Sequence, residues 1–316
     1  MGGLSADGFG AVAAAYDLGR VLQVGDDPAR GLQGQVWRLI TTAGVWAVKE
    51  ANVPFSEAEA RQADEFADAA RRGGVPAPAA RLTRGGRHVA LVGDTAIRVQ
   101  AWVDLDPPDP HLDPASVGAM LGSLHRVSLP AGASPHWWYT EPVGAATWDT
   151  LVDECQAAAA PFADRLAGIR DDLVALEMIM TPMTPVQRCH LDLWADNVRG
   201  TPGGGLCVID WDNSGPADPS RELALVLYEF GRTDRHRLRT LYDAYRDQGG
   251  PGQLRDPADF AMLAAQLGHI GAMHLRRWLD PSASTAERDG ARRGIEEFVG
   301  DPFTTATMIE IIAALD

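Results

Sequence analysis

The densest group of reactive side chains lies in the second half of the chain. His190, Asp192 and Asn197 fall within eight residues, and Asp210 comes thirteen residues after Asn197, at the end of a short apolar run. The glycine triplet at 203–205 suits the turn of a hairpin between them. A carboxylate and an amide oxygen from adjacent strands are suitable ligands for Mg²⁺, a hard cation. The other carboxylate can then orient a hydroxyl nucleophile, so the set predicts phosphoryl transfer.

A lone lysine supports this chemistry. Of the 28 basic residues only Lys49 is a lysine, and it lies in the apolar stretch 45–50. A lysine ammonium is a compact, flexible point charge, whereas an arginine guanidinium is a planar fork. Because arginine stands at every other basic position, the exception indicates a need for an ammonium here. We expect Lys49 to bind nucleotide phosphates rather than to be a solvated strand residue.

The first hundred residues are predicted to be mostly strand. Their apolar and β-branched runs predict strands at 20–24, 35–41, 45–50, 88–92 and 95–103. A single helix is expected at 56–72, where Ser56 can cap the first turn and two glutamates favour it. Beyond this part, the segment 104–114 contains four prolines and four aspartates, which is typical of a linker between domains.

Helices are predicted for most of the remaining chain. The segment 162–176 has apolar residues at spacings of four and three, as expected for an amphipathic helix. Asp113 and Pro114 are suited to begin another helix as N-cap and first residue. Further helices are expected at 220–231, 234–247, 257–279, 286–299 and 304–315.

In this order, the motifs resemble the aminoglycoside phosphotransferase and choline kinase-like family, whose members have a protein-kinase-like fold. The family's catalytic loop reads HxDxxxxN, and its metal aspartate lies in an Ile-Asp-Trp or Ile-Asp-Phe segment, as at 190–197 and 209–211 here. Other segments follow the family order: the lysine strand 45–49, the Gly-Val-Pro-x-Pro turn 74–78, the helix 117–125 and the Asp-Pro segment 217–224. Together these motifs span roughly residues 20–230, which is more specific than any single motif.

The resemblance implies a role for each matching residue. Asp192 would be the catalytic base, and His190 belongs to the same catalytic set, where we expect it to hold the loop by hydrogen bonds. Asn197 and Asp210 would be ligands of Mg²⁺, and Lys49 would contact the phosphates of ATP or GTP. These roles are those of the phosphoryl-transfer machinery of kinases.

The resemblance also implies further nucleotide contacts. The Ala101 carbonyl and the Val103 N–H would bind adenine at a hinge between two lobes. A helix glutamate would pair with the lysine, and the candidates are Glu57, Glu59 and Glu65. We expect Glu59, because Ala63, Phe66 and Ala70 continue its helical face.

Some positions depart from the family pattern. No G-x-G-x-x-G loop is present between residues 25 and 34, Leu191 stands where the family commonly has Gly, and Leu193 replaces a frequent His. None of these changes removes a ligand. Asp196 and Asp212 lie beside functional residues, and we expect them to face solvent or substrate rather than a metal.

The charged and aromatic residues of the chain restrict which molecules it can bind. The chain has 43 acidic against 28 basic residues, a formal net charge of −15, which disfavours nucleic acid and favours a small cationic substrate. An aromatic insertion predicts either core residues or the wall of a substrate pocket, at Trp137, Trp138, Tyr139 and Trp148. No obligate protein partner is evident in the pattern.

Cysteine usage and hydropathy predict a cytoplasmic protein. Cys155, Cys189 and Cys207 are odd in number and lack metal-type spacing, so we interpret them as reduced thiols. No apolar run approaches the ~20 residues of a membrane span, and the first twenty residues do not have the pattern of a signal peptide.

We therefore predict a protein-kinase-like, two-lobed α+β fold. Residues 1–103 would form an N-lobe with an antiparallel sheet and one helix, and residues 104–316 a mostly helical C-lobe with the catalytic loop and the substrate-binding helices. The predicted function is ATP- and Mg²⁺-dependent O-phosphorylation of an antibiotic, either an aminoglycoside or a basic peptide, which would confer resistance.

Three alternatives remain at this point. A metabolite kinase of the same fold (choline, homoserine, methylthioribose or fructosamine type) would share every catalytic residue. A protein kinase is disfavoured, because no Ala-Pro-Glu segment follows Asp210. A non-catalytic nucleotide-binding module is the alternative from a different class.

Overall fold

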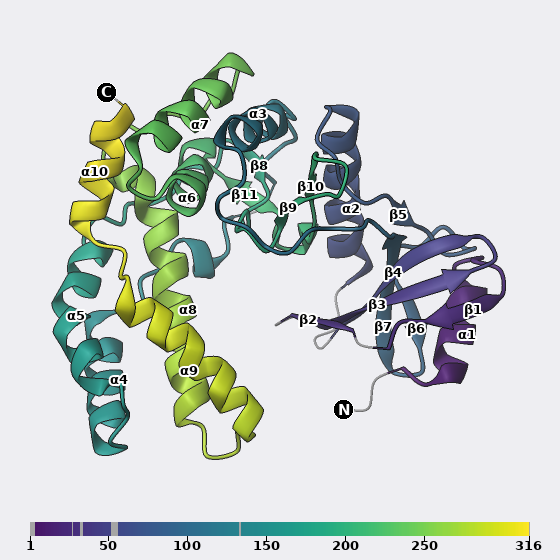
Figure 1. Cartoon of the computed structure of the whole chain (residues 1–316), viewed down its shortest axis with the longest axis horizontal. Coiled ribbons are helices and arrows are strands. Elements are labelled where there is room, and N and C mark those ends of the chain that lie inside the picture. The colour runs from purple at the N-terminus through teal and green to yellow at the C-terminus, as the bar shows by residue number, and fades with distance from the viewer. Residues whose placement is uncertain (1–3, 27, 32–33, 52–55, 133, 316) are drawn as a thin grey trace. The chain divides into compact units, whose positions relative to one another are not determined.

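The computed structural model describes residues 4–26, 28–31, 34–51, 56–132 and 134–315 (Figure 1). The chain packs as two compact units. The first consists of Met1–Asp109 and Ala195–Ser214, and the second of Pro110–Trp194 and Gly215–Asp316. The division after Asp109 falls inside the proline-rich segment 104–114. Residues 195–214, which the sequence places in the C-lobe, pack with the first unit instead.

The first unit contains a seven-stranded antiparallel sheet. Its strand order is β1-β3-β4-β7-β5, with β2 paired to β3 and β6 paired to β7 (Figure 1). The strands are β1 (Val21–Val24), β2 (Ala29–Gly31), β3 (Gly34–Thr41), β4 (Gly44–Ala51), β5 (Ala80–Arg81), β6 (Ala90–Val92) and β7 (Thr95–Ala101). All five predicted strands are present, whereas the short strands β2 and β5 were not predicted. Of the glycine-containing stretch 25–34, residues 27, 32 and 33 lie outside the described residues.

The described residues of this unit form two α-helices, so the prediction of a single helix there was wrong. The expected helix is α2 (Glu57–Arg72), which Ser56 begins with a capping box. The additional helix is α1 (Ala6–Ala15), which Ser5 caps at the Gly8 N–H. Helix α1 contributes to an apolar core that includes Phe9, Val12, Ala13, Tyr16, Leu18, Leu39, Val48, Ile97 and Val99.

A small hairpin completes the first unit. It consists of β9 (Val198–Gly200) and β10 (Leu206–Val208), which pair antiparallel. The Val208 N–H donates to the Pro76 carbonyl at 2.9 Å, and the Trp211 ring packs edge-on against Phe66 of α2 with ring centroids 5.2 Å apart. These contacts fix the chain on both sides of residue 210 against helix α2 and the segment that follows it.

The second unit is mostly helical, as predicted. Its helices are α3 (Pro114–His125), α4 (Ala145–Ala157), α5 (Ala163–Glu177), α6 (Pro219–Gly231), α7 (Arg235–Asp247), α8 (Ala261–Leu279), α9 (Thr285–Gly300) and α10 (Thr305–Leu315). Strands β8 (Gln187–Cys189) and β11 (Gly215–Ala217) pair antiparallel and flank the predicted catalytic loop in sequence. Within the described residues no single helix is long and apolar enough to cross a membrane, and only the bent pair α9 and α10 passes that test, by length and composition.

Candidate active site

In the first unit, Lys49 lies between two carboxylates. Its Nζ is 2.7 Å from Oδ1 of Asp210 and 2.6 Å from Oδ2 of Asp212. The Lys49 side chain is 17% exposed and that of Asp212 is 12% exposed, so this ion cluster is largely shielded from water. Asp212 was predicted to face solvent or substrate rather than a metal; its carboxylate is largely buried and holds the lysine.

Strand β4 positions this lysine through the sheet. Lys49 lies directly opposite Arg98 of β7 in the antiparallel register. Directly opposed residues of antiparallel strands point to the same face of a sheet. The two cations of the cluster are thus adjacent on one face, and both require carboxylate partners.

The β9–β10 hairpin brings the two predicted magnesium ligands together. Asn197 immediately precedes β9, and its carbonyl accepts a hydrogen bond from the Ile209 N–H at 2.9 Å. Asp210 is the next residue, with a left-handed backbone at φ 57° that leads into the short 3₁₀ turn Trp211–Asn213. Its side chain is 33% exposed. An amide oxygen and an accessible carboxylate suit Mg²⁺, so these residues fit the expected ion.

A second pair of contacts extends the cluster to helix α2. Arg98 donates from Nη1 to Asp212 and from Nη2 to Oδ1 of Asp64, the latter at 2.5 Å. The other oxygen of Asp64 is 2.6 Å from Nδ1 of His88. The helix acid that reaches the cluster is therefore Asp64.

The prediction that Glu59 pairs with Lys49 is not supported by these contacts. The Glu59 carboxylate accepts hydrogen bonds from the Ser56 N–H and hydroxyl at 2.9 and 2.8 Å, which completes the capping box of α2. Hydrogen bonding to Ser56 lowers the pKa of Glu59. Glu59 is the third residue of the helix, and its carboxylate is used in the first turn, five residues before Asp64.

In the second unit, buried groups hold the predicted catalytic loop. The Leu191 N–H donates to Oε1 of Glu222, and the Leu191 carbonyl accepts from Nε2 of Gln266 at 2.8 Å. Leu191 has φ 69°, a left-handed backbone that side chains rarely adopt. Glycine, which the resemblance leads one to expect at this position, adopts this conformation without steric cost. Here two side chains fix the backbone on either side of the Leu191 Cα.

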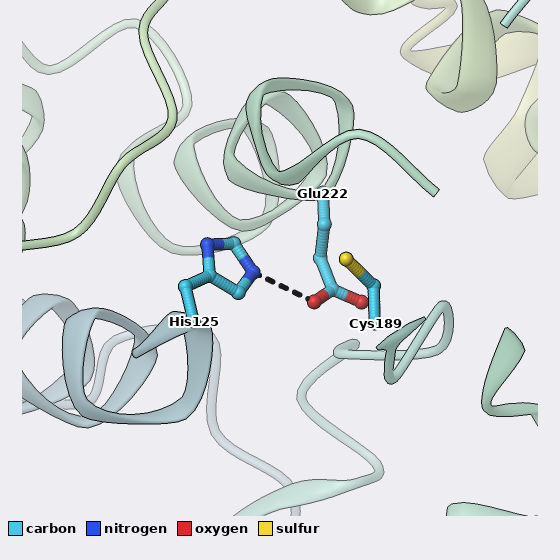
Figure 2. A group of neighbouring side chains, drawn as sticks. All are labelled: His125, Cys189 and Glu222. Atoms are coloured by element: carbon cyan, nitrogen blue, oxygen red, sulfur yellow. Dashed lines mark hydrogen bonds and ion pairs between the residues drawn. The ribbon is translucent and has the colours of Figure 1, made fainter. Parts of the chain in front are cut away.

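Figure 2 shows His125 facing Glu222, with Cys189 beside the same carboxylate. His125 Nε2 is 2.8 Å from Oε2 of Glu222, and His125 Nδ1 is 2.9 Å from the Tyr245 hydroxyl. The candidate ligand atoms of His125, Cys189 and Glu222 all lie within 4.8 Å of one another. Burial raises the pKa of the Cys189 thiol well above its usual range. Glu222 binds His125 through one oxygen and accepts from the Leu191 N–H through the other, so the group supports the loop by hydrogen bonds.

Glu222 is ionised in this support. Complete burial by itself would raise its pKa, but His125, His190 and the Leu191 N–H outweigh burial and lower the pKa below its usual value. His190 is fully buried beside this carboxylate. Its role in holding the loop by hydrogen bonds stays a prediction.

Asp192 follows Leu191 and is half-buried between two buried leucines. It belongs to the second unit, whereas Lys49, Asn197 and Asp210 belong to the first. Asp196 is exposed, as predicted. The residues predicted to bind phosphate and metal thus belong to one unit, and the predicted base belongs to the other.

The aromatic insertion divides into core and surface residues. Trp148 is buried and donates from Nε1 to Glu177 at 2.9 Å, so it belongs to the core. Trp138 stacks on His269 of α8 with ring centroids 5.0 Å apart, and Trp137, which is 47% exposed, contacts the same imidazole edge-on at 4.9 Å. Gln266, which holds the catalytic loop, lies three residues before His269, about one helical turn away on α8.

A model of the phosphotransferase enzyme family, the APH family, matches residues 27–261. The chain belongs to this family. No curated protein matches the chain. The family match includes every predicted catalytic, metal and nucleotide residue of this phosphotransferase.

Solved structures share the fold at low identity. A spectinomycin phosphotransferase in complex with ADP and spectinomycin has a TM-score of 0.68 at 13% identity, covering 97% of this chain and 96% of that chain. An aminoglycoside phosphotransferase from Alicyclobacillus acidocaldarius has a TM-score of 0.60 at 16% identity, covering 94% and 95%. A choline kinase from Streptococcus pneumoniae has a TM-score of 0.56 at 17% identity, covering 91% and 97%. The predicted kinase-like fold is confirmed.

The sequence did contain a signal for the residues that were missed. Asp64 is the acid within the buried face of α2, which also includes Ala60, Ala63, Phe66, Ala67 and Ala70. An acid on an apolar stripe requires a buried partner. Arg98, inside the predicted strand 95–103, could have been identified as that partner.

The predicted adenine contacts lie at the end of the sheet. Ala101 is the last residue of β7, and its N–H donates to the Ala79 carbonyl at 2.8 Å. The Trp102 N–H donates to the Val45 carbonyl at 3.1 Å. Adenine binding by the Ala101 carbonyl and the Val103 N–H stays a prediction.

Proposed function

We propose that the chain transfers the γ-phosphoryl group of ATP to a hydroxyl group of a small cationic molecule, with Mg²⁺ as cofactor. The observation that carries this proposal is the position of Lys49 between Asp210 and Asp212. Lys49 would provide a cation for phosphates, and Asp210 with Asn197 would provide oxygen ligands for a metal. A spectinomycin phosphotransferase of similar fold was crystallised with ADP, which supports nucleotide binding here.

Each site residue of the first unit would have its own role. Lys49 would bind the phosphate oxygens, and Asp212 would keep its ammonium oriented. Asn197 and Asp210 would hold Mg²⁺, which when bound neutralises charge on the phosphates. Ala101 and Val103 would bind adenine through backbone groups.

Asp192 would act on the acceptor. It would orient the hydroxyl and take its proton while the new O–P bond forms and the bond from the γ-phosphorus to ADP breaks. Glu222 and Gln266 hold the preceding residue from both sides, so the carboxylate needs little rearrangement before reaction.

The second unit supports a cationic acceptor. Trp137 and Trp138 present ring faces and edges around His269, and aromatic faces attract cations. Burial lowers the pKa of His269, so its ring is neutral at pH 7 and does not repel a cation. The net charge of −15 attracts the same guest. An aminoglycoside or a basic peptide antibiotic fits these properties, and its phosphorylation would confer resistance.

A coupled ATP-consumption assay across cationic antibiotics and small alcohols tests this function. We expect Mg²⁺-dependent turnover with a cationic, hydroxyl-bearing antibiotic, and a phosphorylated product in the mass spectrum. A preferred acceptor among neutral or anionic metabolites would instead identify a metabolite kinase. Binding of ATP without consumption in the presence of any acceptor would identify a nucleotide-binding module. Repeating the assay with GTP determines the phosphate donor.

A further inference from the structure

Arg98 connects helix α2 to the phosphate-binding lysine. Its side chain is 4% exposed, and its guanidinium donates to Asp212 from one nitrogen and to Asp64 from another. Asp212 uses its second oxygen to accept from Lys49 at 2.6 Å. The path from α2 to the lysine ammonium is therefore a continuous series of alternating charges within the first unit.

The geometry requires an arginine in this position. A planar guanidinium can bond two carboxylates at once through different nitrogens, whereas an ammonium concentrates its charge at one point. Asp64 and Asp212 come from elements far apart in sequence, helix α2 and the turn after β10. Their side chains are 7% and 12% exposed. Without Arg98, two largely buried carboxylates would lack their shared counter-charge.

Asp64 is itself held by a second side chain, His88. The carboxylate accepts from Arg98 through Oδ1 and contacts Nδ1 of His88 through Oδ2 at 2.6 Å. Glu57 in turn accepts from the His88 N–H at 2.7 Å and from the Val89 N–H at 3.1 Å. Helix α2 thus contacts His88 twice, through Asp64 at the ring and through Glu57 at the backbone N–H. These contacts fix Asp64, which in turn holds Arg98.

We propose that Arg98 is a positioning residue for nucleotide binding: it holds Asp212 against Lys49, so the acid of helix α2 acts on the lysine through Arg98 rather than directly. The proposal rests on the proposed function. Asp212 then keeps the ammonium oriented independently of Asp210, whose carboxylate can bind Mg²⁺. Lys49 therefore stays in place when nucleotide and metal arrive.

A double-mutant cycle measured by nucleotide binding tests this role. Calorimetric titration with ADP in the presence of Mg²⁺ would be carried out on the unaltered protein, Arg98→Lys, Lys49→Ala and the double variant. We expect Arg98→Lys to weaken ADP binding about tenfold, within the measured range of coupling in ion networks. In the Lys49→Ala background the same substitution should leave the dissociation constant unchanged within twofold, because Arg98 acts through Lys49.

Asp64→Asn provides a second variant should Arg98→Lys fold poorly, and it should weaken ADP binding in the same lysine-dependent way. Asp68→Asn is the matched control, since Asp68 lies one turn later on α2 in an exposed pair with Arg71. The positioning role would be overturned if these substitutions weakened ADP binding equally with and without Lys49. It would also be overturned if ADP binding did not weaken in folded Arg98→Lys or in folded Asp64→Asn. If ADP bound normally to these variants while Lys49→Ala alone weakened it, the proposed function would stand without this inference. No nucleotide binding by the unaltered protein would overturn both.

Discussion

Two residues of the reactive loops have backbone conformations that side chains rarely adopt. Leu191 has φ 69° and Asp210 has φ 57°. Such conformations cost of the order of 1–3 kcal/mol each and persist only where the surroundings enforce them. At Leu191, Glu222 and Gln266 enforce the conformation through the backbone N–H and carbonyl. Strain therefore coincides with the residue before the proposed base and with a proposed metal ligand.

Lys49→Arg tests the need for an ammonium. The Nζ contacts two carboxylates at 2.7 and 2.6 Å, and a longer planar fork cannot occupy that point. We expect kcat/KM to fall about a hundredfold, the loss that a misplacement of about 1 Å can cause. Steady-state kinetics and a melting curve separate this loss from unfolding. Kinetics identical to those of the unaltered protein would show that the charge alone suffices.

Glu222→Gln should change the pH dependence of stability. Because folding lowers the pKa of Glu222, its ionised form stabilises the protein fully above the ordinary carboxyl value of 4.5. That contribution is lost as the pH falls through the lowered pKa. The difference in unfolding free energy between the unaltered protein and Glu222→Gln should therefore shrink from about pH 7 to pH 3. Denaturant titrations at several pH values measure it, with exposed Glu310→Gln as control. A difference that is constant with pH would mean that the charge of Glu222 contributes nothing.

At the scale of elements, helix α8 links the catalytic loop to the aromatic surface. Gln266 holds the Leu191 carbonyl, and His269 lies one turn later in contact with Trp137 and Trp138. An acceptor bound at these rings would be held by the same helix that fixes the loop of the proposed base. Helix α8 would then couple the position of the acceptor to the geometry of the catalytic loop.

Trp137→Ala should therefore affect the acceptor and not the nucleotide. Trp137 is 47% exposed, so its removal should leave stability nearly unchanged. We expect KM for a cationic acceptor to rise about tenfold through loss of a cation–π contact, with KM for ATP constant. Exposed Met178→Ala is the control in the same unit. A rise in KM for ATP alone would assign Trp137 to another role.

Local sequence patterns predicted most helices and strands. The side-chain contacts between residues far apart in sequence were mostly not predicted. The N-cap of helix α2 and the apolar, β-branched run of strand β4 are visible in the sequence. Helix α1 was missed because Gly8 and Gly10 weaken its helical propensity, while its burial against the sheet stabilises it. The residues of the site were recognised by motif. The contact of Lys49 with Asp212 could not be predicted, because the two residues lie 163 positions apart in sequence and meet only in the folded unit.

At the scale of the whole molecule, charge should influence acceptor binding. A net charge of −15 attracts cations, and salt screens this attraction as the Debye length falls from ~10 Å at 0.1 M to ~3 Å at 1 M. We expect KM for the acceptor to rise several-fold over this range and more than KM for ATP. Initial rates at a series of KCl concentrations measure both. An acceptor KM that ignores salt would mean that acidity serves solubility only.

The most direct test is Asp192→Asn, which removes the proposed base and retains its size. Asp192 would contact the acceptor hydroxyl and not the nucleotide, so kcat should fall about 10²- to 10⁴-fold, the usual contribution of general base catalysis. The dissociation constant for ADP with Mg²⁺ should stay within twofold. Asp196→Asn, at an exposed position four residues later, should retain full activity. Near-full turnover by Asp192→Asn, with ADP binding intact, would contradict the assignment of Asp192 as the base of this phosphotransferase.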